Sequence, residues 1–226
     1  MLSGTLILLG GGDVGDPALA AEILRRSPGP AVAALPTARA YEGPEAAMVE
    51  IASWLGPHGA EVEGIMALSR SDAEVVELAA RLDGVDLAYV ADGTALHLRS
   101  VLKSTVLFDR LMAVLERGAT VAASGAAASV LCDPMVDPRG GAPTVGLGPN
   151  TSFLVVPHLG ADADDPHGEK LARTVALARS SHPVVALGHG TGLVVVPGRP
   201  VEVIGAGELV VYRAGEVVPE GIGALA

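Results

Sequence analysis

The sequence predicts an α/β fold in which a mostly parallel sheet is flanked by helices on both faces and followed by a C-terminal antiparallel β-meander. Apolar runs of strand length alternate with runs of helix length along most of the chain, which is typical of parallel strands joined by helices. Half of the residues are hydrophobic but only 3% are aromatic, so the core is built from Ala, Val and Leu, which suits a sheet covered on both faces. The chain has 226 residues, and we expect one large domain over residues 1–226.

The first part of the chain alternates plainly between the two kinds of element. Strands are expected at the apolar runs Thr5–Leu9, Ala31–Leu35, Ala60–Ile65 and Asp86–Val90. Helices are expected at Pro17–Arg26, Pro44–Trp54, Asp72–Leu82, Ala95–Leu102 and Ser104–Arg117. Asp92 and Gly93 come directly after the fourth strand, at the carboxyl end of the sheet, where open α/β sheets bind their ligands.

Glycines follow the first strand directly, and Gly10 and Gly11 open this loop. Such glycines let backbone N–H groups approach an anion or an oxyanion. The spacing of Gly10, Gly12 and Gly15 fits a dinucleotide site, but the next strand ends without the acidic residue that would hold a ribose. We therefore expect no dinucleotide and no other cofactor.

A sharp strand-to-helix elbow is predicted between Gly118 and Pro134. Ala119–Ala122 reads as a short buried strand and Ala126–Leu131 as the first turns of a helix, which leaves two or three residues for the corner. In α/β hydrolases such an elbow presents a nucleophile in a strained conformation beside backbone N–H groups. The full G-x-S-x-G pattern is not present, so a tight turn packed with alanines is the alternative interpretation.

The remaining elements follow the elbow. The segment Asp133–Asn150 is rich in Pro, Gly and Asp and reads as an exposed loop or a lid, and the strand Phe153–Val156 leads to His158. An acidic turn at 162–167, without the spacing of a calcium loop, precedes a helix over Glu169–Ala178. The closing meander is expected at Pro183–Leu187, Gly192–Val196, Val201–Ile204 and Glu208–Tyr212.

Charge and cysteine content exclude several functions. The formal net charge of −11 argues against nucleic acid or an anionic membrane as a partner. The lone Cys132 excludes an intramolecular disulfide and lies on an apolar helix face, so we expect it to be buried and inert. No segment resembles a signal peptide or a membrane span, which indicates a cytoplasmic protein.

The order of these parts resembles the cyanophycinase and dipeptidase E family of serine exopeptidases, which have the class I glutamine amidotransferase-like fold. The resemblance covers essentially the whole chain. It implies cleavage of aspartate-containing peptides by a serine nucleophile, a histidine base and an acidic residue that orients the histidine, without a metal. It also implies that a small acidic peptide or an amino-acid-like molecule is the ligand.

The motifs that carry this resemblance are degenerate in the present chain. The family elbow, Gly-Thr-Ser-Ala-Gly-Ala, aligns without gaps so that the nucleophile falls on Gly125, followed by Ala126. The family's strand-end motif falls on Asp92-Gly93-Thr94-Ala95, and its histidine falls on His158. The motif that supplies the acid falls on Leu187-Gly188-His189-Gly190-Thr191-Gly192, which has no carboxylate, so His158 is expected to lack an orienting acid.

Three interpretations remain open. In the first, the protein is an inactive relative that keeps or reuses a small-ligand pocket. In the second, the elbow is shifted by one residue, and Ser124 with His158 forms an active serine hydrolase. In the third, the protein is a homo-oligomeric binding or scaffold protein, such as a homodimer, in which the pocket has no function and the apolar C-terminal strands supply an interface. A pocket filled by side chains of the Asp133–Asn150 loop would favour this interpretation. An open cleft at Gly10, Gly93, Ser124 and His158 would favour a pocket function.

The glycine-flanked His189 is a further candidate because Gly188 and Gly190 leave its ring accessible. With His158 it would form a two-histidine pocket for a carboxylate or a metal. No third ligand is fixed by spacing, so we expect no metal. His158 also fits a structural histidine that bonds backbone carbonyls.

Overall fold

The computed structural model describes residues 3–161, 168–219 and 221–225. Its strands are β1 (Thr5–Leu9), β2 (Ala31–Leu35), β3 (Glu61–Gly64), β4 (Leu87–Val90), β5 (Thr120–Ser124), β6 (Met135–Val136), β7 (Pro143–Thr144), β8 (Leu154–Leu159), β9 (Val184–Gly188), β10 (Thr191–Val195), β11 (Glu202–Gly205), β12 (Leu209–Arg213) and β13 (Glu216–Val217). Its α-helices are α1 (Pro17–Arg25), α2 (Pro44–Leu55), α3 (Arg70–Ala73), α4 (Val76–Ala79), α5 (Ala95–Leu102), α6 (Val106–Glu116), α7 (Ala126–Val130) and α8 (Glu169–Leu177). Short 3₁₀ helices are η1 (Thr37–Arg39), η2 (Gly56–His58), η3 (Ala80–Leu82) and η4 (Gly221–Leu225).

The main sheet confirms the predicted fold class. It has seven strands in the order β11-β10-β1-β5-β4-β2-β3. The strands from β1 to β3 in this order pair in parallel, and β10 and β11 add an antiparallel edge beside β1. Because β1 and β5 are neighbours in the middle of the sheet, the glycine loop after β1 lies next to the elbow after β5.

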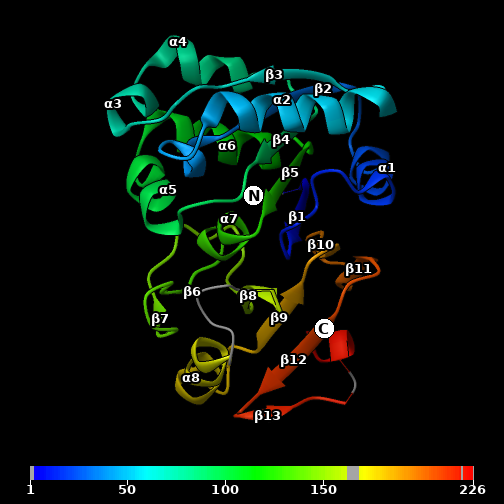
Figure 1. The fold of residues 1–226 in the computed structure, drawn as a ribbon, viewed down its shortest axis with the longest axis vertical. Helices are drawn as coiled ribbons and strands as arrows, with labels where there is room; N and C mark the ends of the chain where they lie inside the picture. Colours follow the sequence, from blue (N-terminus) through cyan, green and yellow to red (C-terminus); the bar gives the residue numbers. More distant parts are fainter. Residues whose placement is uncertain (1–2, 162–167, 220, 226) are drawn as a thin grey trace.

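Helices cover both faces of this sheet, as the composition predicts. Successive residues of each central strand face opposite sides, so Ile7 and Leu9 lie in one apolar cluster with α1 and α2. Leu6 and Leu8 lie in the other cluster, with α5, α6 and α7. Figure 1 shows this layered part in the upper half of the molecule.

A second sheet lies in the lower half of Figure 1 and is packed against α8. It has four strands in the order β13-β12-β9-β8, with β8 and β9 parallel and the others antiparallel. Of the closing strands, β10, β11 and β12 are antiparallel to their partners as expected, whereas β9 pairs with β8 in parallel and with β12 in antiparallel orientation. The closing strands are also shared between two sheets. The strands β10 and β11 join the main sheet, whereas β9 and β12 join the second one.

Three segments differ from the prediction in detail. The helix expected over Asp72–Leu82 is broken into α3, α4 and η3, because Val75 has an extended backbone (φ −75°, ψ 110°). The strand before the elbow extends to Ser124, two residues beyond the expected end at Ala122. The Asp133–Asn150 loop contains the short hairpin β6–β7.

The acidic turn predicted at 162–167 lies outside the described residues. Within the described ranges, we find no helix with the length and apolar character that a membrane span requires.

Candidate functional site

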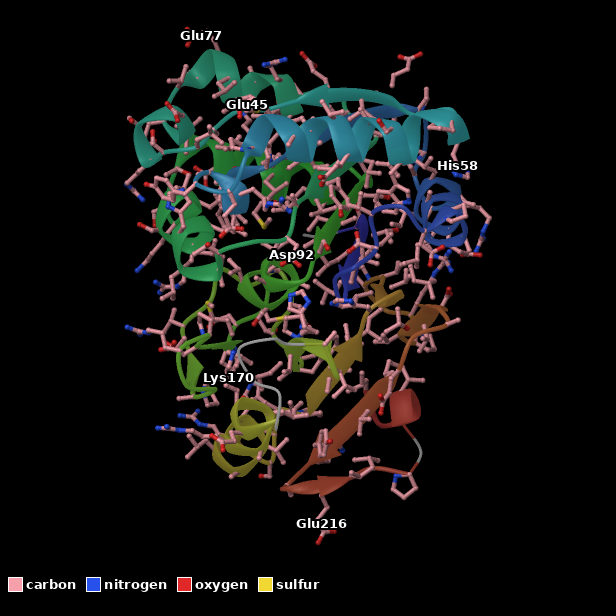
Figure 2. The ribbon with its side chains drawn as sticks, in the orientation of Figure 1. Glu45, His58, Glu77, Asp92, Lys170 and Glu216 are labelled. Atoms are coloured by element: carbon pink, nitrogen blue, oxygen red, sulfur yellow. The ribbon has the colours of Figure 1, made fainter. Side chains whose placement is uncertain are left out.

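The candidate site lies where the carboxyl ends of β1, β4 and β5 meet the end of β8 and the β9–β10 turn. Figure 2 shows Asp92 in the middle of the molecule, between the two sheets. The glycine loop after β1 connects the two sides. Gly10 accepts a hydrogen bond at 2.9 Å from the backbone N–H of His158, and Gly11 accepts one at 3.2 Å from Gly190. This loop therefore fixes both histidine-bearing segments against the main sheet.

Three successive glycines make this close approach sterically feasible. A Cβ atom at Gly10 would overlap the carbonyl of Gly188, and one at Gly11 would overlap the ring of His158. A Cβ atom at Gly12 would be 2.7 Å from the ring of His189. Gly10, Gly11 and Gly12 are thus required by packing at the site.

The elbow turns at Gly125. Its backbone angles are φ 52° and ψ −120°, a conformation that L-amino acids adopt only under strain. The preceding residue, Ser124, is the last of β5, and the following residue, Ala126, is the first of α7. The corner of the elbow is therefore Gly125, the residue on which the sequence resemblance predicts that the family nucleophile falls.

The carboxylate of Asp92 lies in front of this corner. Its Oδ1 atom accepts hydrogen bonds from the backbone N–H groups of Gly93 at 2.7 Å and Ala126 at 2.8 Å. A Cβ atom at Gly125 would overlap Cγ and both oxygens of Asp92. The two N–H groups that could stabilise an oxyanion at the elbow are thus bound to a side chain of the protein itself.

Two histidines extend this arrangement. Nε2 of His158 is 3.2 Å from Oδ2 of Asp92, and Nδ1 of His158 is 3.0 Å from Nε2 of His189. His158 has φ 58°, a strained value for a non-glycine residue at the end of a strand. As expected from the Leu187–Gly192 motif, no carboxylate comes from that segment, and Nδ1 of His158 faces His189 instead. The contact of Nε2 with Asp92, from a different motif, was not predicted. We refer to these three side chains as the Asp92–His158–His189 array.

The surroundings of Asp92 favour its ionised form. Burial raises the pKa of this carboxyl, but the hydrogen bond and charge of His158 and the N–H groups of Ala126 and Gly93 outweigh it, so the pKa is lowered below its usual value. The side chain keeps 29% of its surface exposed, and that of His158 keeps 26%. The array is therefore a partly accessible, negatively charged carboxylate next to an imidazole pair.

Ser124 points away from the array. Its side chain is 1% exposed, and its hydroxyl donates a hydrogen bond to the carboxylate of Asp13. Tyr89 donates to the other oxygen of the same carboxylate. Burial raises the pKa of Asp13, and hydrogen bonds from Ser124 and Tyr89 offset part of that rise. Sequence reasoning missed Asp13 and Tyr89; the one available signal was an acidic residue directly after the glycine loop.

A cavity of about 320 Å³ opens beside the array. Of the site residues, Gly93, Ala126 and His158 line this cavity. The Asp133–Asn150 loop contributes part of its wall and leaves its interior open. The other lining residues are Ala95, Ser129, Val136, Asp137, Pro138, Val156, Pro157, Leu159, Gly160, Gly168, Lys170 and Leu171. In Figure 2, Lys170 marks the α8 side of the molecule.

The structure thus brings together the residues selected from the sequence, with the exception of the Ser124 side chain. The residues that lie together are Gly10, Gly11, Asp92, Gly93, Gly125, Ala126, His158, Gly188 and His189. Their roles remain predictions. Among the described residues, no group of three or more His, Cys, Asp or Glu side chains is arranged to hold a metal ion. Cys132 is fully buried, and burial raises the pKa of its thiol to about 12.

A central parallel sheet with a strained elbow and a histidine facing it defines a peptidase-like α/β protein. The chain belongs to peptidase family S51, whose model matches residues 6–203, and this confirms the resemblance found in the sequence. No curated protein matches the sequence.

Two crystal structures support the fold. A peptidase from an acI-B1 Actinobacterium has a TM-score of 0.81 at 22% sequence identity, with 96% of this chain and 97% of that chain covered. A protein assigned as peptidase E from Listeria monocytogenes EGD-e has a TM-score of 0.65 at 16% identity, with 90% and 99% covered.

Proposed function

We propose that this protein is a family S51 member that does not cleave peptides through a serine nucleophile and that uses the pocket at the former catalytic centre for a small ligand. The observation that carries the proposal is the pairing of Gly125 with Asp92. Acyl transfer needs a hydroxyl at the corner of the elbow and N–H groups open to the oxyanion. Here the corner has no side chain, and a carboxylate takes up both N–H groups.

The alternative of a shifted elbow is disfavoured by the contacts of Ser124. A serine nucleophile has to give its proton to the histidine base. The Ser124 hydroxyl instead donates a hydrogen bond to the buried Asp13. Ser124 is the last residue of β5 and lies before the corner of the elbow. A scaffold role is disfavoured because the cavity beside His158 is open. Small acidic peptides and amino-acid-like molecules are the ligands we propose to test first, in the cytoplasm and with no requirement for a metal.

The test is to incubate the purified protein with a fluorophosphonate probe and, separately, with β-aspartyl and N-terminal-aspartyl dipeptides. An active peptidase of the same family serves as the positive control. We expect no labelling and no dipeptide cleavage, with dipeptide binding detected as an upward shift of the melting temperature. Labelling that is lost in Ser124→Ala would instead establish the shifted elbow and an active hydrolase.

A further inference from the structure

Asp92 itself lines a second cavity, which has a volume of about 150 Å³ and shares no lining residue with the larger one. Its wall comes from the loop after β1, from η1, from α2 and from the carboxyl ends of β4 and β5. The charged side chains in this wall are Asp13, Arg39, Glu50 and Asp92. We refer to this space as the charged cavity. Through Asp92 it is connected to the array.

Contacts between the surrounding elements hold the walls of the charged cavity together. The backbone N–H of Thr94 donates to the carbonyl of Ala38 at 2.9 Å, which keeps η1 beside the segment after β4. On the α2 side, Nε1 of Trp54 donates to the carbonyl of Asp16 at 2.7 Å, and the Trp54 ring packs edge-on against Tyr89. The cavity is therefore framed by elements that are fixed to one another before a ligand binds.

Carboxylates supply the negative side of the charged cavity. Asp92 is partly exposed, and its lowered pKa keeps it ionised at neutral pH. Glu50 is exposed on α2 and, within the described ranges, has no hydrogen-bond or ion-pair partner. Asp13 is buried in the wall and fixed by hydrogen bonds from Ser124 and Tyr89. Burial raises the pKa of Asp13, and the nearby charge of Asp92 adds to this rise, so a cation in the cavity would relieve their repulsion.

Arg39 supplies the positive side of the same wall. Its Nε atom is 3.4 Å from the carbonyl oxygen of Glu42 and 3.9 Å from the Glu42 carboxylate, and both contacts are long. Among the described residues, none accepts a hydrogen bond from its two terminal amino groups. A guanidinium presents such groups as a fork that matches the two oxygens of a carboxylate. The cavity thus offers a place for an anionic group as well as for a cationic one.

We propose that the charged cavity binds a small α-amino acid as its zwitterion, with the ammonium group at Asp92 and Glu50 and the carboxylate group at Arg39. The inference rests on the proposed function, because it names the ligand of the site that Asp92 belongs to. A metal ion is the other cation that carboxylates bind, but it would leave the guanidinium without an anion. In the described part of the chain, these carboxylates are also not arranged to hold a metal ion.

The volume of the charged cavity limits the size of the ligand. Pockets for larger molecules measure about 300–1,000 Å³, so a cavity of about 150 Å³ suits a smaller one. A free amino acid keeps its two charged groups on one carbon, whereas a peptide separates them by at least one further residue. The apolar part of the wall, formed by Ala47, Ile51 and Ala91, is available to a short side chain. Acidic peptides need more room, and we expect them in the larger cavity.

The test compares three molecules that differ in their charged groups. L-Alanine carries both groups, ethylamine lacks the carboxylate, and propionate lacks the ammonium group. Their dissociation constants for the purified wild-type protein are measured by ligand-observed NMR titration at neutral pH. We expect L-alanine to bind about tenfold or more tightly than either of the other two, because one hydrogen bond to a charged group commonly contributes a factor of about ten or more.

Three variants place the ligand in the charged cavity. Arg39→Gln should weaken L-alanine about tenfold and leave ethylamine unchanged, because ethylamine has no carboxylate. Glu50→Gln should weaken both molecules by about two- to fivefold, since Glu50 is exposed to solvent. Arg81→Gln is the matched control, because Arg81 pairs with Glu63 outside the site and is 39% exposed, against 32% for Arg39. It should bind L-alanine as the wild type does.

The inference is overturned if the wild type does not bind L-alanine, or if ethylamine or propionate binds as tightly as L-alanine does. This comparison stands even if a variant fails to fold. L-Alanine binding that a folded Arg39→Gln protein keeps unchanged would also overturn it, since the ligand would then lie elsewhere. Fluorophosphonate labelling of a serine would overturn the proposed function. A wild type that is not labelled and does not bind L-alanine overturns this inference alone.

Discussion

The carboxylate of Asp92 fills the space that any side chain at Gly125 would need. The overlap involves Cγ and both oxygens of Asp92, so a small rotation of the carboxylate group would not relieve it. The two positions are therefore coupled: a side chain at the elbow and a carboxylate at the end of β4 exclude each other. This coupling decides how the site responds to an attempt to restore a serine.

Gly125→Ser alone should destabilise the protein by about 2–6 kcal/mol, because the strained backbone and the overlap with Asp92 each cost about 1–3 kcal/mol. It should also remain unlabelled by fluorophosphonate. The double variant Asp92→Gly with Gly125→Ser removes the overlap and should be more stable than the single one. Urea unfolding of the three proteins checks this order, and labelling is expected only in the double variant.

Gly59→Ser is the matched control for the backbone contribution. Gly59 has φ 94°, and no atom lies within 4 Å of the place that a Cβ atom would take, so only the cost of positive φ, about 1–2 kcal/mol, applies. A Gly125→Ser protein no less stable than Gly59→Ser would contradict the coupling.

Ser124→Ala should lower stability by about 1–3 kcal/mol, because it leaves the buried Asp13 carboxyl with one hydrogen-bond donor fewer. Thermal or urea unfolding measures the change. Ser152→Ala, at an exposed serine, should be nearly neutral. An unchanged Ser124→Ala protein would mean that the hydroxyl is not a buried donor and would reopen the shifted elbow.

The pH dependence of Asp92→Asn should reveal the lowered pKa of Asp92. A carboxyl whose pKa is depressed on folding contributes stability above its unfolded pKa of about 3.9, and this is lost as pH falls through the folded value. The difference in unfolding free energy between wild type and variant should be constant above pH of about 4 and shrink below it. Urea titrations across acidic pH measure it; a difference that does not change with pH would refute the shift.

The difference in unfolding free energy between wild type and Asp13→Asn should change with pH in the opposite direction. The pKa of Asp13 is raised by burial, so its contribution is fully present below the unfolded pKa of about 3.9 and is lost as pH rises through the folded pKa. The stability of wild type relative to Asp13→Asn should therefore decline with increasing pH above about 4. A parallel series of urea titrations tests this, and a rising difference would contradict it.

Much of the fold was predictable because its signals are local. Apolar strands that end in glycine, and helices that begin at Pro17 or Pro44, follow from short stretches of sequence. The broken segment around Val75 was not predictable, since its apolar residues also fit one continuous helix. The division of the closing strands between two sheets depends on long-range pairing that spacing does not encode.

The candidate site was predictable in its location but not in its contacts. Small residues marked the elbow, yet the strand was expected to end at Ala122. Because the chain stays extended to Ser124, that side chain takes the direction that the strand imposes and reaches Asp13. The contact between Asp92 and His158 joins the segment after β4 of the main sheet to β8 of the second sheet, so no local pattern could indicate it.

The glycine loop after β1 gives the site a mechanical property. Asp92 follows β4 of the main sheet, and His158 belongs to β8 of the second sheet. The loop accepts hydrogen bonds from the backbone N–H groups of His158 and Gly190. A rotation of one sheet against the other would therefore have to break these two backbone hydrogen bonds together with the contact between Asp92 and His158. The imidazole NMR signals of His158 and His189 would change if these contacts broke, so they would report the relative position of the two sheets.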